Sequence, residues 1–391
     1  MEIDMLENTK GTIIKVVGVG GAGGNAVQHM INKGVSGVEF IVANTDAQAL
    51  SLSKAHNVIQ IGESGLGAGM KPALGRQLAE ETRERIEDSL RGAHMVFIAA
   101  GMGGGTGTGA APVVAQVAKQ LGALTVAVVS KPFTYEGKKC MDIANEGLDE
   151  LSKHVDSLIV ILNEKLEEIY EDDSMADWLQ HADDVLNNAV AGIAEIINVP
   201  GHINVDFNDV KTIMAEQGKA MMGTAVASGV DRARIAAEQA IASPLLDGID
   251  LSGARGVLVN VTGSRSLKGK EIKDVMATVR AFAADDASIA QGIAYDETMG
   301  DELRVTVVAT GLGRARRAPV LVPNPVAVQR TGTYNEPVAP VDAVPGANQQ
   351  FDAIRTPAVW RRESASETVR AMERNGTETY DIPAFLRRQA D

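Results

Sequence analysis

The sequence contains one cysteine, Cys140, among 391 residues, so no disulfide can form within the chain. Such a composition suits a reducing compartment. Only 37 lysines and arginines face 51 acidic residues, and the formal net charge of −14 disfavours nonspecific nucleic-acid binding and direct docking on an anionic membrane. The chain shows no signal-peptide pattern and no apolar run long enough to cross a bilayer. These absences predict a cytoplasmic protein that reaches a membrane only through a partner.

The chain also lacks a lysine-bearing phosphate loop, because the string GxxxxGK[ST] does not occur in it. A different glycine-rich loop follows the apolar run Met95 to Ala99, with glycines at positions 101, 103, 104, 105, 107 and 109 and an alanine-rich helical pattern after them. Glycine backbone can approach an anion closely, Thr106 and Thr108 can donate hydroxyl groups, and the helix start adds free N–H groups. The pattern predicts a phosphate-binding loop between a strand and a helix.

A second glycine cluster follows the β-branched run at residues 12–19. Gly18 to Gly23 fits GxGxxG after a strand, which in isolation is a weak indication of a Rossmann dinucleotide site. Two glycine loops in one chain suit the phosphates of a mononucleotide triphosphate better. The alternative is an oxidoreductase that binds NAD and has no preference for GTP.

The periodicity of the first half predicts an α/β domain. Strand-like runs alternate with helical stretches, which is typical of a doubly wound parallel sheet with ligands at the carboxyl ends of its strands. The expected strands are residues 12–19, 38–43, 95–99, 124–129 and 158–162, and the expected helices include 72–90 and 112–120. From Met175 to Ile197 apolar residues recur at three- and four-residue steps, which predicts one long buried helix. Strand-like runs at 256–262, 287–294 and 303–309 predict a second, α+β domain.

The last part of the chain differs in composition. Seven of the thirteen prolines lie between Pro319 and Pro357, where hydrophobic periodicity ends, and this predicts a disordered linker. Large apolar side chains then return beside a basic pair. This end of the chain predicts a partner-binding peptide, with candidate contacts Asp381, Ile382, Pro383, Phe385 and Leu386.

An acidic segment with the pattern NxDxxD follows the predicted long helix. Asn204, Asp206 and Asp209 form this pattern, far in sequence from both glycine loops. One interpretation is that Asp206 or Asp209 caps a helix predicted over residues 210–222, because short acids are favoured at helix starts. A catalytic interpretation depends on family resemblance.

GGGTGTG at residues 103–109 resembles the phosphate loop of the tubulin/FtsZ family, and the similarity runs nearly continuously from Lys10 to Gly313 and returns in the last dozen residues. The resemblance implies a tubulin-like fold. Its implied parts are a GTP-binding domain (1–174), a central helix and connection (175–203), a C-terminal activation domain (204–314), the disordered linker (315–379) and the partner-binding peptide (380–391).

The resemblance implies GTP or GDP with Mg²⁺ as ligands, and the motifs suggest no side chain that binds the metal. Asp183 would accept from the guanine N1 and N2 hydrogens, although from the residues alone it could be a solvated helix residue like Asp184. The implied nucleotide-binding residues are Gly20, Gly21, Ala22, Gly23, Gly24, Asn25, Asn44, Ala68, Gly69, Gly103, Gly104, Gly105, Thr106, Gly107, Thr108, Gly109, Glu136, Cys140, Leu179 and Asp183. The family commonly places phenylalanine at the position of Leu179 and arginine at that of Cys140.

In the family the acidic segment enters the nucleotide pocket of the next subunit. The resemblance therefore implies that Asp206 and Asp209 polarise the attacking water and that Asn204 helps to position the loop. It further implies head-to-tail filaments that form the cytokinetic ring at mid-cell, with GTP hydrolysed between subunits and the tail bound to membrane-tethering proteins such as FtsA and ZipA. The departures at Leu179 and Cys140 leave an alternative, a divergent nucleotide-binding filament protein with little turnover.

Overall fold

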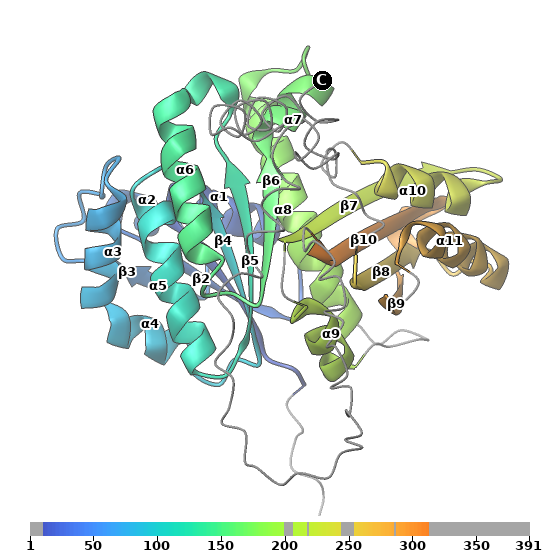
Figure 1. Cartoon of the computed structure of the whole chain (residues 1–391), viewed down its shortest axis with the longest axis horizontal. Helices are drawn as coiled ribbons and strands as arrows, with labels where there is room; N and C mark the ends of the chain where they lie inside the picture. The colour runs from blue at the N-terminus through green and yellow to red at the C-terminus, as the bar shows by residue number, and fades with distance from the viewer. Residues whose placement is uncertain (1–10, 199–205, 217–218, 244–253, 285–286, 313–391) are drawn as a thin grey trace, which may run out of the picture. The chain divides into compact units, whose positions relative to one another are not determined.

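The computed structural model describes residues 11–198, 206–216, 219–243, 254–284 and 287–312 (Figure 1). Ten strands of these residues form one sheet in the order β3-β2-β1-β4-β5-β6-β7-β10-β8-β9. The strands are β1 Ile14–Val19, β2 Val38–Asn44, β3 Asn57–Gln60, β4 Met95–Gly101, β5 Leu124–Lys131, β6 Ser157–Leu162, β7 Lys219–Ser228, β8 Gly256–Gly263, β9 Ser288–Tyr295 and β10 Glu302–Leu312. The first six strands pair in parallel, so the predicted doubly wound sheet is confirmed.

Helices cover both faces of this parallel half (Figure 1). The helices are α1 Gly20–Asn32, α2 Ala47–Ser51, α3 Pro72–Glu81, α4 Arg83–Leu90, α5 Thr106–Gln120, α6 Lys138–Leu151, α7 Asn163–Ile169, α8 Met175–Asn198, α9 Phe207–Met214, α10 Arg232–Ile241 and α11 Gly269–Phe282, with short 3₁₀ turns η1 Thr134–Glu136 and η4 Glu297–Met299. Side chains alternate along β1, with Val16 in the core beneath α1 and α8 and Val17 in the core beneath α3 to α6. Among the described helices, none has the length and apolar character needed to cross a membrane.

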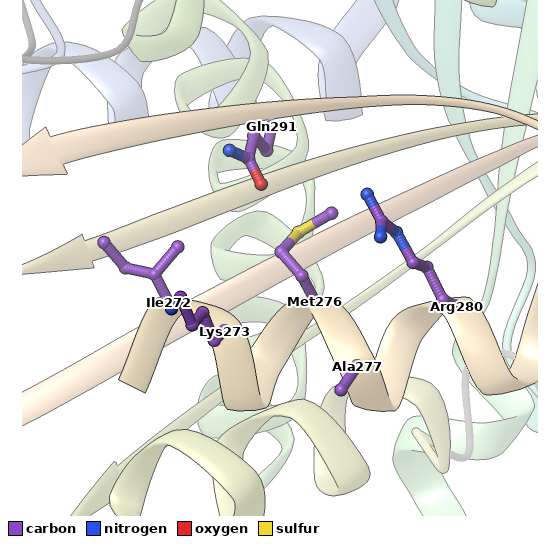
Figure 2. A pocket seen from close by; sticks show the side chains of 6 residues that line it. All are labelled: Ile272, Lys273, Met276, Ala277, Arg280 and Gln291. Carbon is purple, nitrogen blue, oxygen red and sulfur yellow. The ribbon is translucent and has the colours of Figure 1, made fainter. Parts of the chain in front are cut away.

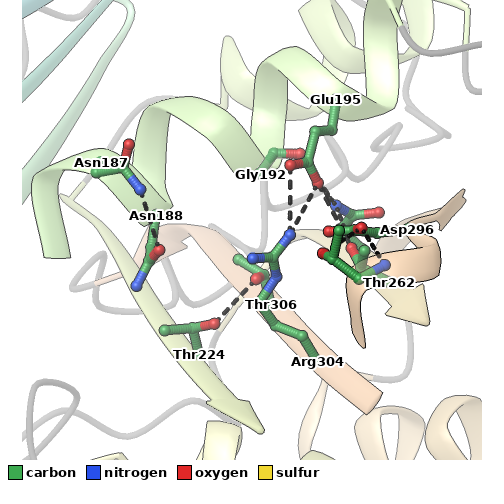
Figure 3. A network of polar contacts seen from close by, with 11 residues as sticks. Asn187, Asn188, Gly192, Glu195, Thr224, Thr262, Asp296, Arg304 and Thr306 are labelled. Carbon is green, nitrogen blue, oxygen red and sulfur yellow. Dashed lines mark hydrogen bonds and ion pairs between the residues drawn. The ribbon is translucent and has the colours of Figure 1, made fainter. Parts of the chain in front are cut away.

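Helix α8 links the parallel strands β1 to β6 to the second unit, which consists of β7 to β10 with α10 and α11. Its buried face, which includes Leu186, Val190 and Ile193, belongs to the same hydrophobic core as β1 and as Val308 of β10. Glu195 on this helix also accepts hydrogen bonds from Arg304 at 3.3 Å and from Asn260 at 3.3 Å (Figure 3). The predicted long helix is therefore confirmed; it packs apolar side chains in the core shared with both parts of the sheet and makes hydrogen bonds to β8 and β10.

Three helix boundaries differ from the prediction. The single helix predicted over residues 72–90 is two helices, α3 and α4, divided at Thr82, whose hydroxyl donates to Leu78 O at 2.8 Å and accepts from Gly62 N at 3.0 Å. The segments predicted as glycine turns are partly helical, since α1 begins at Gly20 and α5 begins at Thr106.

The helix predicted over residues 210–222 was also wrong. Helix α9 ends at Met214, and the following apolar residues form β7, which pairs antiparallel with β10. Met222 packs in the core around α8, whereas Met221 packs in a separate core beneath α10 and α11. A strand that buries both faces reads as a continuous apolar run, which periodicity alone does not distinguish from a helix.

A buried ion pair holds α10 against α11 in the second unit. The Arg232 side chain is 6% exposed and donates from Nε to Glu271 Oε1 at 2.7 Å. It also donates to the backbone oxygen of Asp301 at 2.9 Å. Hydrogen bonding to Glu271 raises the pKa of Arg232, and the same bond lowers the pKa of Glu271. Removing the guanidinium therefore leaves a poorly hydrated carboxylate without its partner.

We expect Arg232→Met to lower the free energy of unfolding by about 3 kcal/mol, because a buried charge loses its counter-charge. Urea denaturation followed by circular dichroism measures the change. The matched control is Arg234→Met, which removes an exposed pair with Glu238 at 2.9 Å and is expected to have little effect. Equal midpoints for the two variants would contradict the assignment.

Candidate functional site

The predicted phosphate loops lie at one edge of the sheet. Because β1, β2, β4, β5 and β6 are parallel, the loops that follow them gather at their carboxyl ends. The loop after β4 contacts its neighbours directly: Met102 N donates to Ser130 O at 2.9 Å, and the hydroxyls of Thr106 and Thr45 lie 2.7 Å apart. These contacts connect the loops that follow β2 and β4 to each other and to the end of β5.

Most glycines of the loop serve close packing between backbones. A Cβ atom on Gly105 would lie 2.1 Å from Gly69 O, and one on Gly109 would lie 2.1 Å from Pro72 O. A Cβ atom on Gly20, where φ is +75°, would lie 2.9 Å from Gly107 N, so the two glycine clusters are adjacent. These glycines are required by the fold whatever the loop binds.

Two glycines differ from the others because space is open beside them. A Cβ atom on Gly21 or on Gly104 would meet no atom within 4 Å, and both residues are exposed. They lie at the start of α1 and before the start of α5, where helix N–H groups lack intrahelical partners. Gly21 and Gly104 are therefore the positions at which an anion can approach the backbone.

The threonines of the loop are already engaged in hydrogen bonds. Thr108 is buried and its hydroxyl accepts from Gly103 N at 2.9 Å, where Gly103 has φ at +106°. Thr106 shares its hydroxyl contact with Thr45, at 2.7 Å. Both hydroxyls thus hold the loop in shape, in addition to any contact with a ligand.

The segment that follows β2 and the segment that precedes α3 also meet at this edge. Asn44 is buried and its Oδ1 accepts from Asp46 N at 3.3 Å, and Thr45 O accepts from Gly67 N at 3.0 Å. Ala68 is buried beside the exposed Gly69. Of the other positions predicted in the first glycine cluster, Ala22 and Asn25 are exposed, Gly24 is half-buried and Gly23 is buried.

Asp183 lies half-buried on α8 and receives no hydrogen bond from the described part of the chain. Burial raises the pKa of its carboxyl to about 6, His29 opposes the rise, and the adjacent Asp184 adds to it. Asp184 is not a solvated helix residue, because its Oδ1 lies 2.7 Å from His29 Nε2 and 3.3 Å from Lys33 Nζ of α1. Of the two neighbouring acids, Asp183 is the one left for a ligand.

Aromatic rings stack close to Leu179 and Glu136, two of the predicted nucleotide contacts. Phe133 stacks on Trp178 with ring centroids 6.2 Å apart and on Tyr135 with centroids 5.5 Å apart. Leu179 follows Trp178 and is 48% exposed, so it has free surface for a flat ligand. Glu136 Oε1 accepts from Phe133 N at 2.9 Å within η1. Cys140 is buried on α6, and its backbone oxygen would lie 3.0 Å from a Cβ on Gly103.

Sequence reasoning missed one candidate, Asn163. It directly follows β6 at the carboxyl edge, it is 6% exposed, and its Oδ1 has no partner among the described residues. An unpaired buried oxygen is costly unless a ligand or water satisfies it. A polar residue directly after a parallel strand was the available signal.

The two acids of the NxDxxD pattern, Asp206 and Asp209, lie at the opposite edge of the same sheet. Asp206 caps α9 by accepting from Asp209 N at 2.8 Å, so the capping interpretation is confirmed for Asp206. Both acids are exposed. Asn204, like the candidate contacts Asp381, Ile382, Pro383, Phe385 and Leu386, lies outside the described residues.

The described residues that flank 199–205 make contacts at the amino ends of the strands. Phe207, the first residue of α9, meets the ring of His94, which immediately precedes β4. Asn198, the last residue of α8, donates to Gly37 O, immediately before β2, at 2.5 Å. Since the seven residues of β4 span about 20 Å, the acids of a chain lie far from its own Gly104.

Two cavities of about 360 Å³ lie in the second unit, away from the glycine loops. One lies between α11 and β9 and is lined by Ile272, Lys273, Met276, Ala277, Arg280 and Gln291 (Figure 2). The other lies between α9 and β9 and includes Asp209 in its wall. The second cavity shows that the surface around this acid is hollowed.

A doubly wound sheet with two packed glycine loops at its carboxyl edge defines a nucleotide-binding protein. Comparison with known proteins specifies the class. The family description "Tubulin/FtsZ family, GTPase domain" matches residues 13–171, and "FtsZ family, C-terminal domain" matches residues 218–313.

The relatives agree with this class. The chain is 51% identical to the cell division protein FtsZ of Pseudomonas putida over 388 residues, 97% of each chain. It is also 51% identical to FtsZ of Pseudomonas aeruginosa, covering 99% of this chain and all of that one. A solved FtsZ dimer from M. jannaschii matches with a TM-score of 0.74 and 45% identity, over 78% of this chain and 89% of that chain. The chain therefore belongs to the FtsZ family and carries its GTPase domain.

We expect two substitutions in one loop to separate packing from ligand contact. Gly105→Ala forces a methyl group against Gly69 O and lowers the melting temperature by several degrees. Gly104→Ala leaves the melting temperature nearly unchanged, yet weakens GDP binding by about tenfold, because its methyl group fills the open side of the loop. Thermal melts and calorimetric titration of GDP measure the two effects. GDP binding of Gly104→Ala at the original affinity would contradict the role of this opening.

Proposed function

We propose that this chain is a cell-division GTPase that assembles head to tail, with each reaction centre built from two neighbouring chains. The glycine loops of one chain bind the phosphates of GTP. Asp206 and Asp209 of the next chain polarise the water that attacks the γ phosphate, and Asn204 helps to position their loop.

The observation that carries this proposal is the separation of the two half-sites. The loops at Gly21 and Gly104 follow the carboxyl ends of β1 and β4, whereas His94 and Gly37, which contact the segments flanking the acidic loop, precede the amino ends of β4 and β2. One edge of a parallel sheet meets the opposite edge of another only when two copies stack with the same polarity. Such a contact is heterologous, so it repeats and generates a filament.

The two exposed acids suit the water-orienting role. A carboxylate activates water best when it stays ionised and can reach the attacking oxygen. Asp206 uses one oxygen to cap α9, which fixes its orientation, and Asp209 is exposed in the first helical turn, so both groups are available to a neighbouring surface.

We assign Asp183 to the edge of the guanine base. The stacked rings of Phe133, Tyr135 and Trp178 lie near the bound base. A half-buried carboxylate that accepts no hydrogen bond from the described residues matches two adjacent N–H donors. Leu179 supplies apolar contact with the base, Glu136 lies on the sugar side, and Asn163 supplies an oxygen that lacks a partner among the described residues. Cys140 lies beneath the phosphate loop, where the family has a cation.

Mg²⁺ is compatible with this site as an ion that arrives with the nucleotide. No group of three His, Cys, Asp or Glu side chains able to hold a metal occurs within the described ranges, which suits an ion held mainly by phosphate oxygens and water. When bound, it would supply positive charge that these lysine-free loops lack.

The wider assignment follows the family. We propose a cytoplasmic protein that forms a ring at the mid-cell division site, with the domain boundaries predicted from the sequence. The peptide at 380–391 would bind membrane-tethering proteins such as FtsA and ZipA. Leu179 and Cys140 motivate a second candidate, a nucleotide-binding filament protein with little turnover, and the GTP turnover of assembled chains distinguishes the two.

Asp209→Ala is expected to bind GTP normally and to lower GTP turnover by about a hundredfold or more, because the attacking water loses its orienting carboxylate. Asn208→Ala is the matched control, since Asn208 is exposed on the same turn of α9. Phosphate release at saturating GTP measures both, and normal turnover by Asp209→Ala would refute the role of the acid.

Mixing two inactive proteins tests whether the site is shared. Asp209→Ala retains an intact pocket, and Gly104→Trp retains intact acids behind a pocket whose open side is filled by the large side chain. If a filament joins the pocket of one to the acids of the other, the mixture regains turnover that neither protein shows alone. A mixture that remains as inactive as its components would refute the two-chain centre.

The pKa of Asp183 gives a pH prediction. Guanine donors require the carboxylate form, so affinity is complete above the folded-state pKa and falls as the pH drops through it. With a pKa of about 6, the ionised fraction falls about fourfold between pH 7.5 and pH 5.5. The GDP affinity of the wild type, divided by that of Asp183→Asn, should fall by the same factor, because the amide does not titrate. A constant ratio would exclude Asp183 from the guanine contact.

A further inference from the structure

Helix α9, which carries the acids, is held at its two ends by different parts of the sheet. At its far end, Thr310 of β10 donates its hydroxyl to Ile213 O at 2.8 Å. At its near end, Phe207 packs partly buried against the core around α8 and meets the ring of His94. The far contact belongs to the second unit and the near contact to the parallel sheet.

His94 is itself fixed by backbone hydrogen bonds at the amino edge. Its Nδ1 accepts from Ile13 N at 2.9 Å, and its own N–H donates to Ile13 O at 2.9 Å. Its carbonyl accepts from Leu124 N at 2.9 Å. Since Nδ1 is an acceptor, the neutral ring carries its hydrogen on Nε2. The side chain, although exposed, is therefore oriented by Ile13, the residue that precedes β1.

The contact between the two rings is edge to face. Their centroids lie 6.3 Å apart and their planes meet at 67°, which is a favourable arrangement of aromatic quadrupoles. Phe207 directly follows Asp206 and lies two residues before Asp209. A shift of Phe207 against His94 would move both acids by a similar distance.

We propose that His94 is a positioning residue for hydrolysis, and that its ring holds Phe207 so that Asp206 and Asp209 stand at a fixed place on the amino edge. This inference rests on the proposed function, in which those acids act on GTP bound to the neighbouring chain. In this arrangement His94 contacts neither the nucleotide nor the attacking water. It acts through Phe207, and misplacing a reacting group by about 1 Å is enough to slow a reaction strongly.

Two substitutions of His94 separate its ring from its hydrogen bond. His94→Asn places Oδ1 where Nδ1 stands, so it retains the acceptor for Ile13 N but removes the ring. His94→Phe retains a ring for Phe207 and removes the acceptor. We expect His94→Asn to lower GTP turnover per sedimented chain by about five- to tenfold at saturating GTP. We expect His94→Phe to retain at least about half of the turnover, and both variants to bind GDP as the wild type does.

The reciprocal variant is Phe207→Leu, which removes the same contact from α9. Its turnover should fall as for His94→Asn, and the double variant should be no slower than either single one, because the two changes remove one interaction. Phe207→Leu also provides the test if His94→Asn fails to fold.

The inference is overturned if His94→Asn hydrolyses GTP at the wild-type rate, or if His94→Phe is as slow as His94→Asn, since the ring would then be irrelevant. Additive losses in the double variant would overturn it as well. Asp209→Ala, assayed in parallel, distinguishes this failure from a failure of the proposed function. A slow Asp209→Ala beside a normal His94→Asn rejects only the role of His94, whereas a normal Asp209→Ala rejects the catalytic acids themselves.

Discussion

The polarity of the parallel sheet is the constraint on which the rest of this structure depends. Parallel strands bring every loop that follows them to one edge, and both glycine loops are there. The contacts made by Asn198 and Phe207 hold the flanks of the acidic segment at the other edge. The glycine loops and the acids Asp206 and Asp209 therefore lie at opposite edges of one molecule, and in the proposed reaction centre a second molecule of the same polarity joins them.

Close packing explains how the phosphate edge can be built before a ligand arrives. Gly105 and Gly109 allow backbone of the loop before α3 and of α3 itself to pass where any side chain would collide. Hydroxyl contacts such as Thr106 with Thr45 then connect the loops sideways. The open positions at Gly21 and Gly104 are held by this framework, so binding need not pay for ordering the loops.

The sequence predicted the elements whose periodicity is local. β1, α8 and the strand before the phosphate loop were predictable from apolar spacing and glycine placement, and so was the parallel sheet. β7 was not, because Met221 and Met222 pack in two different cores and their run has no period. The helical start at Gly20 was also missed, since glycine is a poor helix former and the backbone of Gly20 lies against Gly107, which is far away in sequence.

The candidate site follows the same division. The glycine loops and the NxDxxD acids were visible as motifs, whereas the surroundings of Asp183 depend on His29 and Lys33, far away in sequence. A lone histidine before a strand gives no sign that it will meet Phe207. Long-range contacts of this kind determine that Asp184 is paired while Asp183 is left for a ligand. They also determine where Asp206 and Asp209 lie, and no local sequence pattern encodes them.

The most direct test of the two-chain reaction centre is phosphate release per chain as the protein is diluted, with the oligomeric state at each concentration followed by analytical ultracentrifugation. The account predicts negligible GTP hydrolysis by single chains and a rise in turnover per chain above the concentration at which assemblies form. Single chains that hydrolyse GTP as fast as assembled ones would contradict it.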